Sequence, residues 1–235
     1  MIYIESKVTD PAWNLALESW LFDWETKEDI LFLWQNDACV VIGKNQSAPL
    51  EVDLDAAREL GVPVIRRQTG GGAVWHDAGN LNFTYITNDD PETESPYAAF
   101  LGPLVEVLAE QGIEAAFNGR NDLCVQGRKI SGSAARVRNG RLLHHGTLLV
   151  CSDFAPMERL LTPDAAKLRR NGIRSVKSRV ANLTDFAPEL TVAKLKDLLR
   201  GKFAPERELV LSPADLEQIR TRQARYRDPA WNFQK

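Results

Sequence analysis

Three consecutive glycines follow a pair of arginines in the segment RRQTGGGAVWHDAGN, residues 66 to 80. Because glycine has no Cβ, this backbone can approach a ligand closely and turn its amide groups toward a phosphate or a carboxylate. Arg66 or Arg67 adds a planar, permanently charged fork that suits phosphate oxygens. The segment is neither a Walker A loop nor a dinucleotide-binding turn, since no Gly-Lys-Ser/Thr follows and no helix opens there. A turn without a ligand remains the alternative interpretation.

A lysine lies among small residues in GRNDLCVQGRKISGSAARV, residues 119 to 137. Asn121 and Asp122 stand on one side of a predicted β-hairpin and Lys129 on the other. A strand interior rarely holds an ammonium group without a partner, so one interpretation gives Lys129 an anionic ligand. The other interpretation is that Lys129 points to solvent from the outer face.

Two adjacent histidines interrupt an otherwise apolar strand in LLHHGTLLV, residues 142 to 150. Successive side chains of a strand point to opposite faces, so His144 and His145 cannot easily bind one metal ion together. At most one of them is expected to be functional. A histidine satisfied in the core or at the surface is the alternative for both, and also for His76.

The elements expected to position these residues are mostly strands, followed by helices. Asp10 before Pro11 predicts a helix start, and apolar residues at helical spacing continue it to Trp24. The runs ILFLWQ and CVVIG predict a hairpin. Further expected elements are a helix at 54–60, the strand VPVIRR, an extended segment at 73–86, a helix at 97–111 and strands at 122–150 with turns at Gly127 and Asn139-Gly140. Helices are expected at 160–170, 192–202 and 212–227, so the pattern predicts one α+β domain.

Composition excludes several classes of protein. The 235 residues are 44% hydrophobic and 26% charged, which suffices for one sizeable core. A net charge of −3 gives no overall cationic field, so nucleic-acid binding is not expected. The three cysteines form no CxxC pair, and neither a disulfide framework nor a zinc cluster is predicted. Without an apolar run of about 18 residues or a signal-peptide pattern, we expect a cytoplasmic protein with no membrane attachment.

The motifs occur in the order found in one known family. RRQTGGGAVWHDAGNLNF, GRNDL, GRKISGSA, HHGTLL and KLRRNGIRSVKSRVANLTDF together resemble the lipoate-protein ligase A catalytic domain along nearly the whole chain. DPAWNLALE and the pair LFLWQN and VVIG belong to the same pattern. The resemblance implies an α+β fold, a mixed β-sheet flanked by helices, shared with biotin protein ligases and class II aminoacyl-tRNA synthetases. It also implies that residues 1–235 form a single catalytic domain, expected to be a monomer.

The resemblance implies an adenylate-forming reaction. In that family lipoate and ATP with Mg²⁺ give lipoyl-adenylate and pyrophosphate, and the lipoyl group then moves to a lysine of an acceptor protein. The implied cofactors are ATP and Mg²⁺, with lipoate as substrate. The acceptor would be a 2-oxoacid dehydrogenase E2 domain, a glycine-cleavage H protein or a lipoate-binding protein. Lys129 would be the catalytic cation, and Asp122 would lie near Mg²⁺.

The family motifs also imply two sets of binding residues. The set for ATP and the adenylate is Arg67, Gly70, Gly71, Gly72, Ala73, Asn121, Asp122, Lys129, Ser133 and Ala134. The set for lipoate is Arg67, Thr69, Gly72, His76, Lys129, His145, Gly146 and Thr147. Leucines after His145 would border the channel for the apolar acyl chain.

Alternative hypotheses remain at this stage. Related transferases move octanoyl from acyl carrier protein through a cysteine thioester without ATP, but Leu142 and Glu114 occupy the two positions of their nucleophiles here. Cys124 and Cys151 lie nearby and keep a transferase as the alternative. A non-catalytic module that binds an acidic protein or nucleic acid would use the basic run Lys167, Arg169, Arg170, Arg174, Lys177 and Arg179. That run is otherwise a solvated face or a docking site for an acidic acceptor.

Familiar bacterial ligases continue into an accessory domain after a segment like Trp231-Asn232-Phe233, whereas this sequence stops at Lys235. The resemblance therefore leaves three expectations. A separate accessory-domain protein could supply the missing part, the ligase could be short by nature, or the chain could be an artificial truncation.

Overall fold

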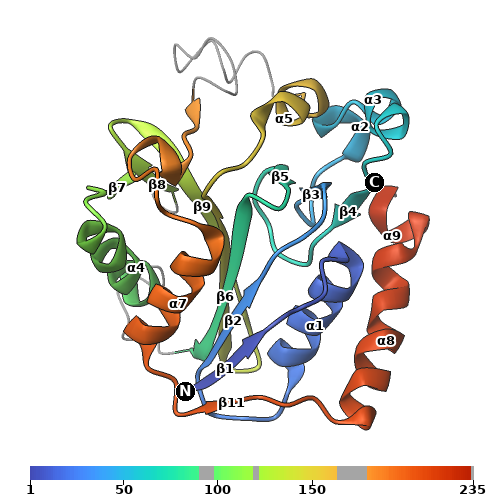
Figure 1. The fold of residues 1–235 in the computed structure, drawn as a ribbon. Helices are drawn as coiled ribbons and strands as arrows, with labels where there is room; N and C mark the ends of the chain where they lie inside the picture. Colours follow the sequence, from blue (N-terminus) through green and yellow to red (C-terminus); the bar gives the residue numbers. More distant parts are fainter. Residues whose placement is uncertain (90–97, 119–121, 163–178, 234–235) are drawn as a thin grey trace.

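A central mixed sheet organises the molecule. The computed structural model describes residues 1–89, 98–118, 122–162 and 179–233 (Figure 1). The central sheet has eight strands in the order β11 (Arg207–Glu208), β1 (Ile2–Glu5), β2 (Ile30–Trp34), β6 (Asn80–Asn88), β10 (Arg141–Leu149), β9 (Arg128–Arg138), β8 (Asp122–Val125) and β7 (Ala116–Asn118). Strand β1 is parallel to β11 and β2, and the remaining neighbours are antiparallel. A second sheet has the order β4 (Val64–Arg66), β3 (Cys39–Ile42), β5 (Val74–His76).

Helices cover both faces of the central sheet. Helices α4 (Ala98–Glu110) and α7 (Val192–Phe203) lie on one side, and α1 (Pro11–Asp23) and α8 (Pro213–Arg227) lie on the other. The small sheet packs against α2 (Ala48–Glu51), α3 (Leu54–Glu59) and α5 (Phe154–Leu160). Within the described residues, the remaining helical elements are a 3₁₀ turn at Leu183–Asp185 and α9 (Pro229–Phe233). This arrangement confirms the predicted α+β class.

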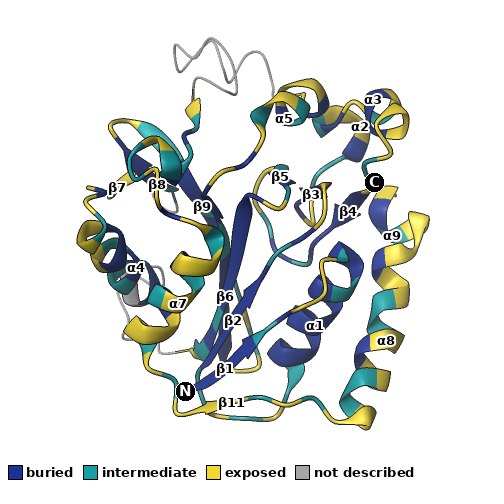
Figure 2. Ribbon diagram, viewed as in Figure 1, coloured by how far each residue is buried: buried dark blue, intermediate teal, exposed yellow. Residues whose placement is uncertain are grey.

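Burial follows these layers. Figure 2 shows the central strands as buried, whereas the outer faces of α7 and α8 are exposed. Each face of the central sheet has its own apolar cluster, and the small sheet has a third. Among the described helices, none is both long and apolar enough to cross a membrane.

Local sequence signals set several boundaries as predicted. The Asp10 carboxylate accepts a hydrogen bond from the Ala12 amide at 3.0 Å and caps α1. Ser212 and Asp215 form a reciprocal capping box at the start of α8. The turns on either side of β9 have positive φ at Gln126-Gly127 and at Asn139-Gly140, as hairpin turns of two residues require.

The expected hairpin of ILFLWQ and CVVIG is wrong. Strand β2 pairs with β1 and β6 in the central sheet, whereas β3 pairs with β4 and β5 in the small one. The loop between β2 and β3 crosses from the central sheet to the small one. Buried Asn36 holds this loop, because it is hydrogen-bonded to Asn14 of α1 at 2.9 Å and to His76 of β5 at 3.0 Å. The extended segment expected at 73–86 is likewise divided between two sheets, by a turn in which Asp77 accepts from the Gly79 amide.

Two further expectations fall partly outside the described residues. The helix expected at 160–170 is wrong at its start, because α5 ends at Leu160 and Leu161 is extended and bridged to Val52. Its remaining residues 163–170 lie outside the described part of the chain, as do Asn121 and the basic run except Arg179.

Candidate functional site

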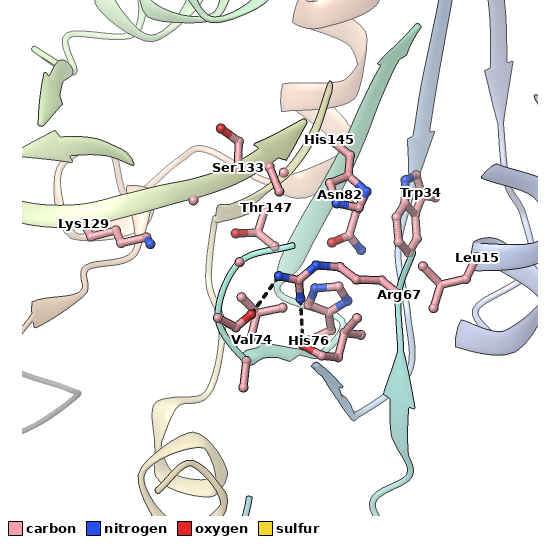
Figure 3. Close-up of a pocket in the computed structure, with 17 residues that line it drawn as sticks. Leu15, Trp34, Arg67, Val74, His76, Asn82, Lys129, Ser133, His145 and Thr147 are labelled. Atoms are coloured by element: carbon pink, nitrogen blue, oxygen red, sulfur yellow. Dashed lines mark hydrogen bonds between the residues drawn. The ribbon is translucent and has the colours of Figure 1, made fainter. Parts of the chain in front are cut away.

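A pocket of about 120 Å³ opens where the central sheet meets the small one (Figure 3). The predicted site residues that line it are Arg67, Gly71, Gly72, Ala73, His76, Lys129, Ser133, Ala134, His145, Gly146 and Thr147. The structure adds Leu15, Trp34, Val41, Val74, Asn82 and Gly132. Thr69, Gly70 and Asp122 do not line the pocket but contact residues that do.

Lys129 provides the cationic end of the pocket. Its Nζ points into the pocket in Figure 3 and lies 2.8 Å from Asp122 Oδ1. The side chain crosses directly over Gly132, where a Cβ would stand 2.6 Å from Nζ and 2.7 Å from Cε. The Lys129 carbonyl accepts from the Ala181 amide at 2.9 Å, which fixes the backbone at this point. Lys129 is therefore a partly exposed cation that faces the pocket and is paired with Asp122.

Arg67 organises the glycine loop, residues 70–72. Its Nη2 donates to the carbonyls of Gly70 at 2.7 Å and Gly72 at 2.8 Å. Its Nε and Nη1 donate to Thr69 Oγ1, the Gly70 carbonyl and the Val41 carbonyl. Burial lowers the pKa of Arg67 to about 10, so it stays charged at neutral pH. Four of its five N–H donors are used within the chain, which leaves at most one for a ligand.

Close contacts require glycine at positions 43 and 71. A Cβ on Gly43 would stand 2.2 Å from the Gly71 carbonyl oxygen. Gly71 itself has φ +92°, a conformation that other residues rarely adopt. The Lys44 amide donates to the Thr69 carbonyl at 2.8 Å, so the turn after β3 holds the loop from outside. The glycine loop therefore forms one wall of the pocket, held by Arg67 and by the turn after β3.

His145 belongs to a buried hydrogen-bonded chain. Its Nδ1 donates to Glu18 Oε1 at 2.7 Å, and its Nε2 is hydrogen-bonded to Thr69 Oγ1 at 2.7 Å. Thr69 Oγ1 in turn accepts from Arg67 Nε, so α1 is linked to the glycine loop. Sequence reasoning missed Glu18. The available signal was a pair of polar residues, Asn14 and Glu18, one turn apart in a helix that is otherwise apolar nearly all round.

His144 points away from the pocket. Its ring packs edge-on against Phe83 and Phe100, with centroids 5.7 and 5.6 Å away, under α4. The prediction that the two adjacent histidines face opposite sides is confirmed.

Two buried N–H groups face the pocket without an acceptor. His76 Nδ1 accepts from Asn36 Nδ2 at 3.0 Å, which places the ring proton on Nε2. His76 Nε2 and Asn82 Nδ2 have no hydrogen-bond partner within the described residues. Burial, with the charge of Arg67 as a smaller cause, lowers the pKa of His76 to about 3. A neutral histidine and an amide are thus available to an acceptor atom of a ligand.

The His76 pKa predicts a pH dependence of stability. The folded-state pKa of about 3 lies below the ordinary 6.5, so the unfolded chain binds more protons between these values. Stability is therefore lost as the pH falls below 6.5. Compared with a His76→Gln variant, the wild-type free energy of unfolding should fall more steeply, by about 1.4 kcal/mol per pH unit. Denaturant titrations from pH 4.5 to 7 measure this, and parallel curves for the two proteins would refute it.

The opposite end of the pocket is apolar. Leu15 and Trp34 lie across the pocket from Lys129 in Figure 3, and Val41 and Val74 complete this end. Burying a CH₂ group of a ligand there is worth roughly 0.8 kcal/mol. The pocket therefore suits an elongated molecule with an anionic head at Lys129 and an apolar tail.

Asp122 alone offers too few ligands for a magnesium ion, and a bound nucleotide would have to supply the others. No cluster of three or more His, Cys, Asp or Glu able to hold a metal occurs in the part of the chain that is described. Asp122 offers one carboxylate beside the pocket. Mg²⁺ commonly binds through one or two carboxylates together with substrate phosphates and waters, so this donor set fits the ion only with a bound nucleotide.

Comparisons with known proteins identify the family. Residues 10–204 match the family model described as the lipoyl protein ligase A/B catalytic domain. Lipoate-protein ligase LplJ from Bacillus subtilis is 36% identical over 243 residues, which cover 99% of this chain and 73% of that relative.

Two solved structures share the fold. One is from a study of the bi-partite lipoate protein ligase of Thermoplasma acidophilum and its E2 lipoyl domain, with a TM-score of 0.86, 28% identity and coverage of 99% of this chain and 95% of that one. The other is lipoate-protein ligase A bound with ATP, with a TM-score of 0.85, 26% identity and coverage of 99% and 97%. The match across most of the sequence confirms the resemblance carried by the motifs: the chain belongs to the lipoyl protein ligase A/B catalytic domain family.

Proposed function

We infer that the chain is an ATP-dependent lipoate-protein ligase, which forms lipoyl-adenylate and passes the lipoyl group to a protein lysine. The observation that carries this function is the two-ended pocket, with Lys129 at one end and Leu15 and Trp34 at the other. Lipoate has a carboxylate head and an apolar tail that match these ends. The similar relative LplJ supports lipoate as the substrate, and the similar structure bound with ATP supports ATP as the nucleotide.

Lys129 is proposed to act where negative charge accumulates. The lipoate carboxylate attacks the α-phosphate of ATP, pyrophosphate leaves, and a mixed anhydride remains. An ammonium group between the carboxylate and the phosphate stabilises the negative charge of that transition state. An acceptor lysine amine then attacks the lipoyl carbonyl and AMP leaves, so no covalent bond to the enzyme is required.

Magnesium is a proposed cofactor. The Asp122 carboxylate would hold it together with phosphate oxygens and waters. A bound ion would neutralise phosphate charge during displacement. Asp122 would then turn from Lys129 toward the ion, which frees the ammonium group for the substrate carboxylate.

The acceptor is proposed to be a lipoyl-accepting protein, with an E2 lipoyl domain as the first choice. The support is the similar Thermoplasma ligase, which was studied with its E2 lipoyl domain. A glycine-cleavage H protein and a lipoate-binding protein are the further proposed acceptors. Because that ligase is bi-partite, a separate accessory-domain protein is also a proposed partner.

Pyrophosphate release tests the first half-reaction. Incubation of the chain with ATP, Mg²⁺ and lipoate, with and without an accessory-domain protein, should release pyrophosphate only when lipoate is present. Omission of Mg²⁺ tests the proposed cofactor in the same assay. Release that does not depend on lipoate, or none even with the accessory protein, would contradict adenylate formation.

The thioester route predicts a different result for the cysteines. Cys124 is buried and its Sγ accepts from Asn118 Nδ2 at 3.7 Å, while Cys151 is exposed and lies outside the pocket lining. Although Cys151 is exposed, the loss of some hydration, with a smaller effect of Asp77, raises the pKa of its thiol, so the thiol is mainly protonated at neutral pH. The double variant Cys124→Ala, Cys151→Ala should keep ATP-dependent transfer within about twofold. Loss of transfer by a folded double variant would favour the thioester mechanism.

A further inference from the structure

Arg66 ties the site to the C-terminal helix α9. Its backbone amide donates to Asn232 Oδ1 at 2.9 Å, and its backbone carbonyl accepts from Trp231 Nε1 at 2.8 Å. Its guanidinium donates to the carbonyls of Trp231 at 2.9 Å and Asn232 at 2.8 Å. The side chain is among the most deeply buried in the structure. Every polar group of Arg66 is thus engaged by α9 or by the turn after β3, where Gly43 and Gln46 also accept.

Arg66 and Arg67 lie on opposite sides of the small sheet. Successive side chains at the end of a strand point to opposite faces, so Arg66 reaches α9 while Arg67 reaches the glycine loop. Arg67 has no freedom to move independently, because its amide donates to the Ile42 carbonyl at 3.0 Å and its side chain holds Gly70 and Gly72. A displacement of Arg66 by α9 would therefore displace the wall of the pocket.

Gln68, the residue after Arg67, gives a second link between the site and the C-terminal helices, through α8. Gln68 Nε2 donates to the hydroxyl of Tyr226 at 3.0 Å, and Gln68 Oε1 accepts from Arg136 Nη1 at 2.7 Å. Tyr226 is joined to α9, because its carbonyl accepts from Asn232 Nδ2 at 2.9 Å. Asn232 therefore contacts both branches of the connection, one through Arg66 and one through Tyr226 and Gln68.

We propose that Trp231 and Asn232 are positioning residues for lipoate binding, which act through Arg66 and Gln68 on the glycine loop. This inference rests on the proposed function for its substrate, since the loop lines the pocket assigned to lipoate. The position of α9 sets how closely the glycine loop surrounds the acyl group, whereas Lys129 on β9 is attached to a different sheet. Lipoate affinity should therefore respond to α9 more strongly than the chemical step does.

The test uses Trp231→Phe, Asn232→Ala and the control Phe233→Ala. Trp231→Phe removes one hydrogen bond to Arg66 and keeps an aromatic ring beneath Arg225. Phe233 is exposed and adjacent in sequence, which makes it a matched control. In the pyrophosphate assay, each of the first two variants should raise the KM for lipoate about five- to tenfold. The kcat and the KM for ATP should stay within about twofold, as should all constants of the control.

Hydrogen–deuterium exchange of the apo proteins gives a second readout that does not require activity. Peptides covering 67–76 should exchange about five- to tenfold faster in the first two variants, with peptides of β6 and β10 unchanged. Unchanged exchange at 67–76 would overturn the inference, and so would an unchanged lipoate KM in an active enzyme. If the wild type fails to release pyrophosphate, the proposed function fails, and the exchange result alone still decides whether α9 positions the loop.

Discussion

Lys129→Ala should lower the rate of adenylate formation by about 10³-fold. The substitution removes the ammonium group that faces the pocket, at the position proposed for the carboxylate and phosphate charges. The free energy of unfolding should change by less than about 1 kcal/mol, because the ion pair with Asp122 is partly exposed. Lipoate-dependent pyrophosphate release and a denaturant titration on the same preparation measure both effects.

The neighbouring Arg128 provides the control for Lys129. It forms a surface ion pair with Asp185 and does not line the pocket. Arg128→Ala should therefore keep adenylate formation within about twofold. Near-normal activity of a folded Lys129→Ala variant would remove this residue from the mechanism, whatever the control shows.

Arg67→Lys should destabilise the protein and disable the site although the charge is kept. Lysine cannot reproduce the planar fork that bonds the carbonyls of Val41, Gly70 and Gly72. Loss of these bonds, one to a buried carbonyl and two to partly buried carbonyls, should cost about 3 kcal/mol of unfolding free energy. The kcat/KM for lipoate should fall about 100-fold, because the loop proposed to position the substrate is displaced.

This result separates two roles for Arg67. If it mainly provided a charge for phosphate, lysine would retain part of the activity and nearly all of the stability. Arg136→Lys is the matched control, since Arg136 contacts the same segment through Gln68 and is partly exposed. Its stability should change by less than about 1 kcal/mol. A stable Arg67→Lys enzyme with a raised KM for ATP alone would contradict the loop role.

Helix boundaries could be predicted because their causes are local. Asp10 and Ser212 cap their helices through amides two or three residues away, so a short window of sequence contains the whole interaction. Strand pairing could not be predicted in the same way. Strands β2 and β3 are neighbours in sequence, yet they belong to different sheets. The loop between them is held by hydrogen bonds from buried Asn36 to α1 and β5, which are distant in sequence.

Site residues could be predicted where a residue type is unusual for the strand or turn that contains it. A glycine run after a strand and a lysine among small residues are such cases, and Gly71 and Lys129 both line the pocket. Asn82 and Trp34 give no such signal, since each is an ordinary residue of a buried strand until the fold brings β2 and β6 beside β5 and β10. Residue spacing alone also does not decide which of Arg66 and Arg67 faces the pocket, because that depends on how β4 is oriented in the small sheet.

The central claim is ligation, and intact mass of an acceptor tests it most directly. A purified apo E2 lipoyl domain is incubated with the chain, lipoate, ATP and Mg²⁺, with parallel samples that lack ATP or contain octanoyl acyl carrier protein in place of lipoate and ATP. We expect a lipoyl adduct on the acceptor only when ATP is present. An adduct formed from the acyl carrier protein without ATP, and none from lipoate with ATP, would contradict the ligase and favour a transferase.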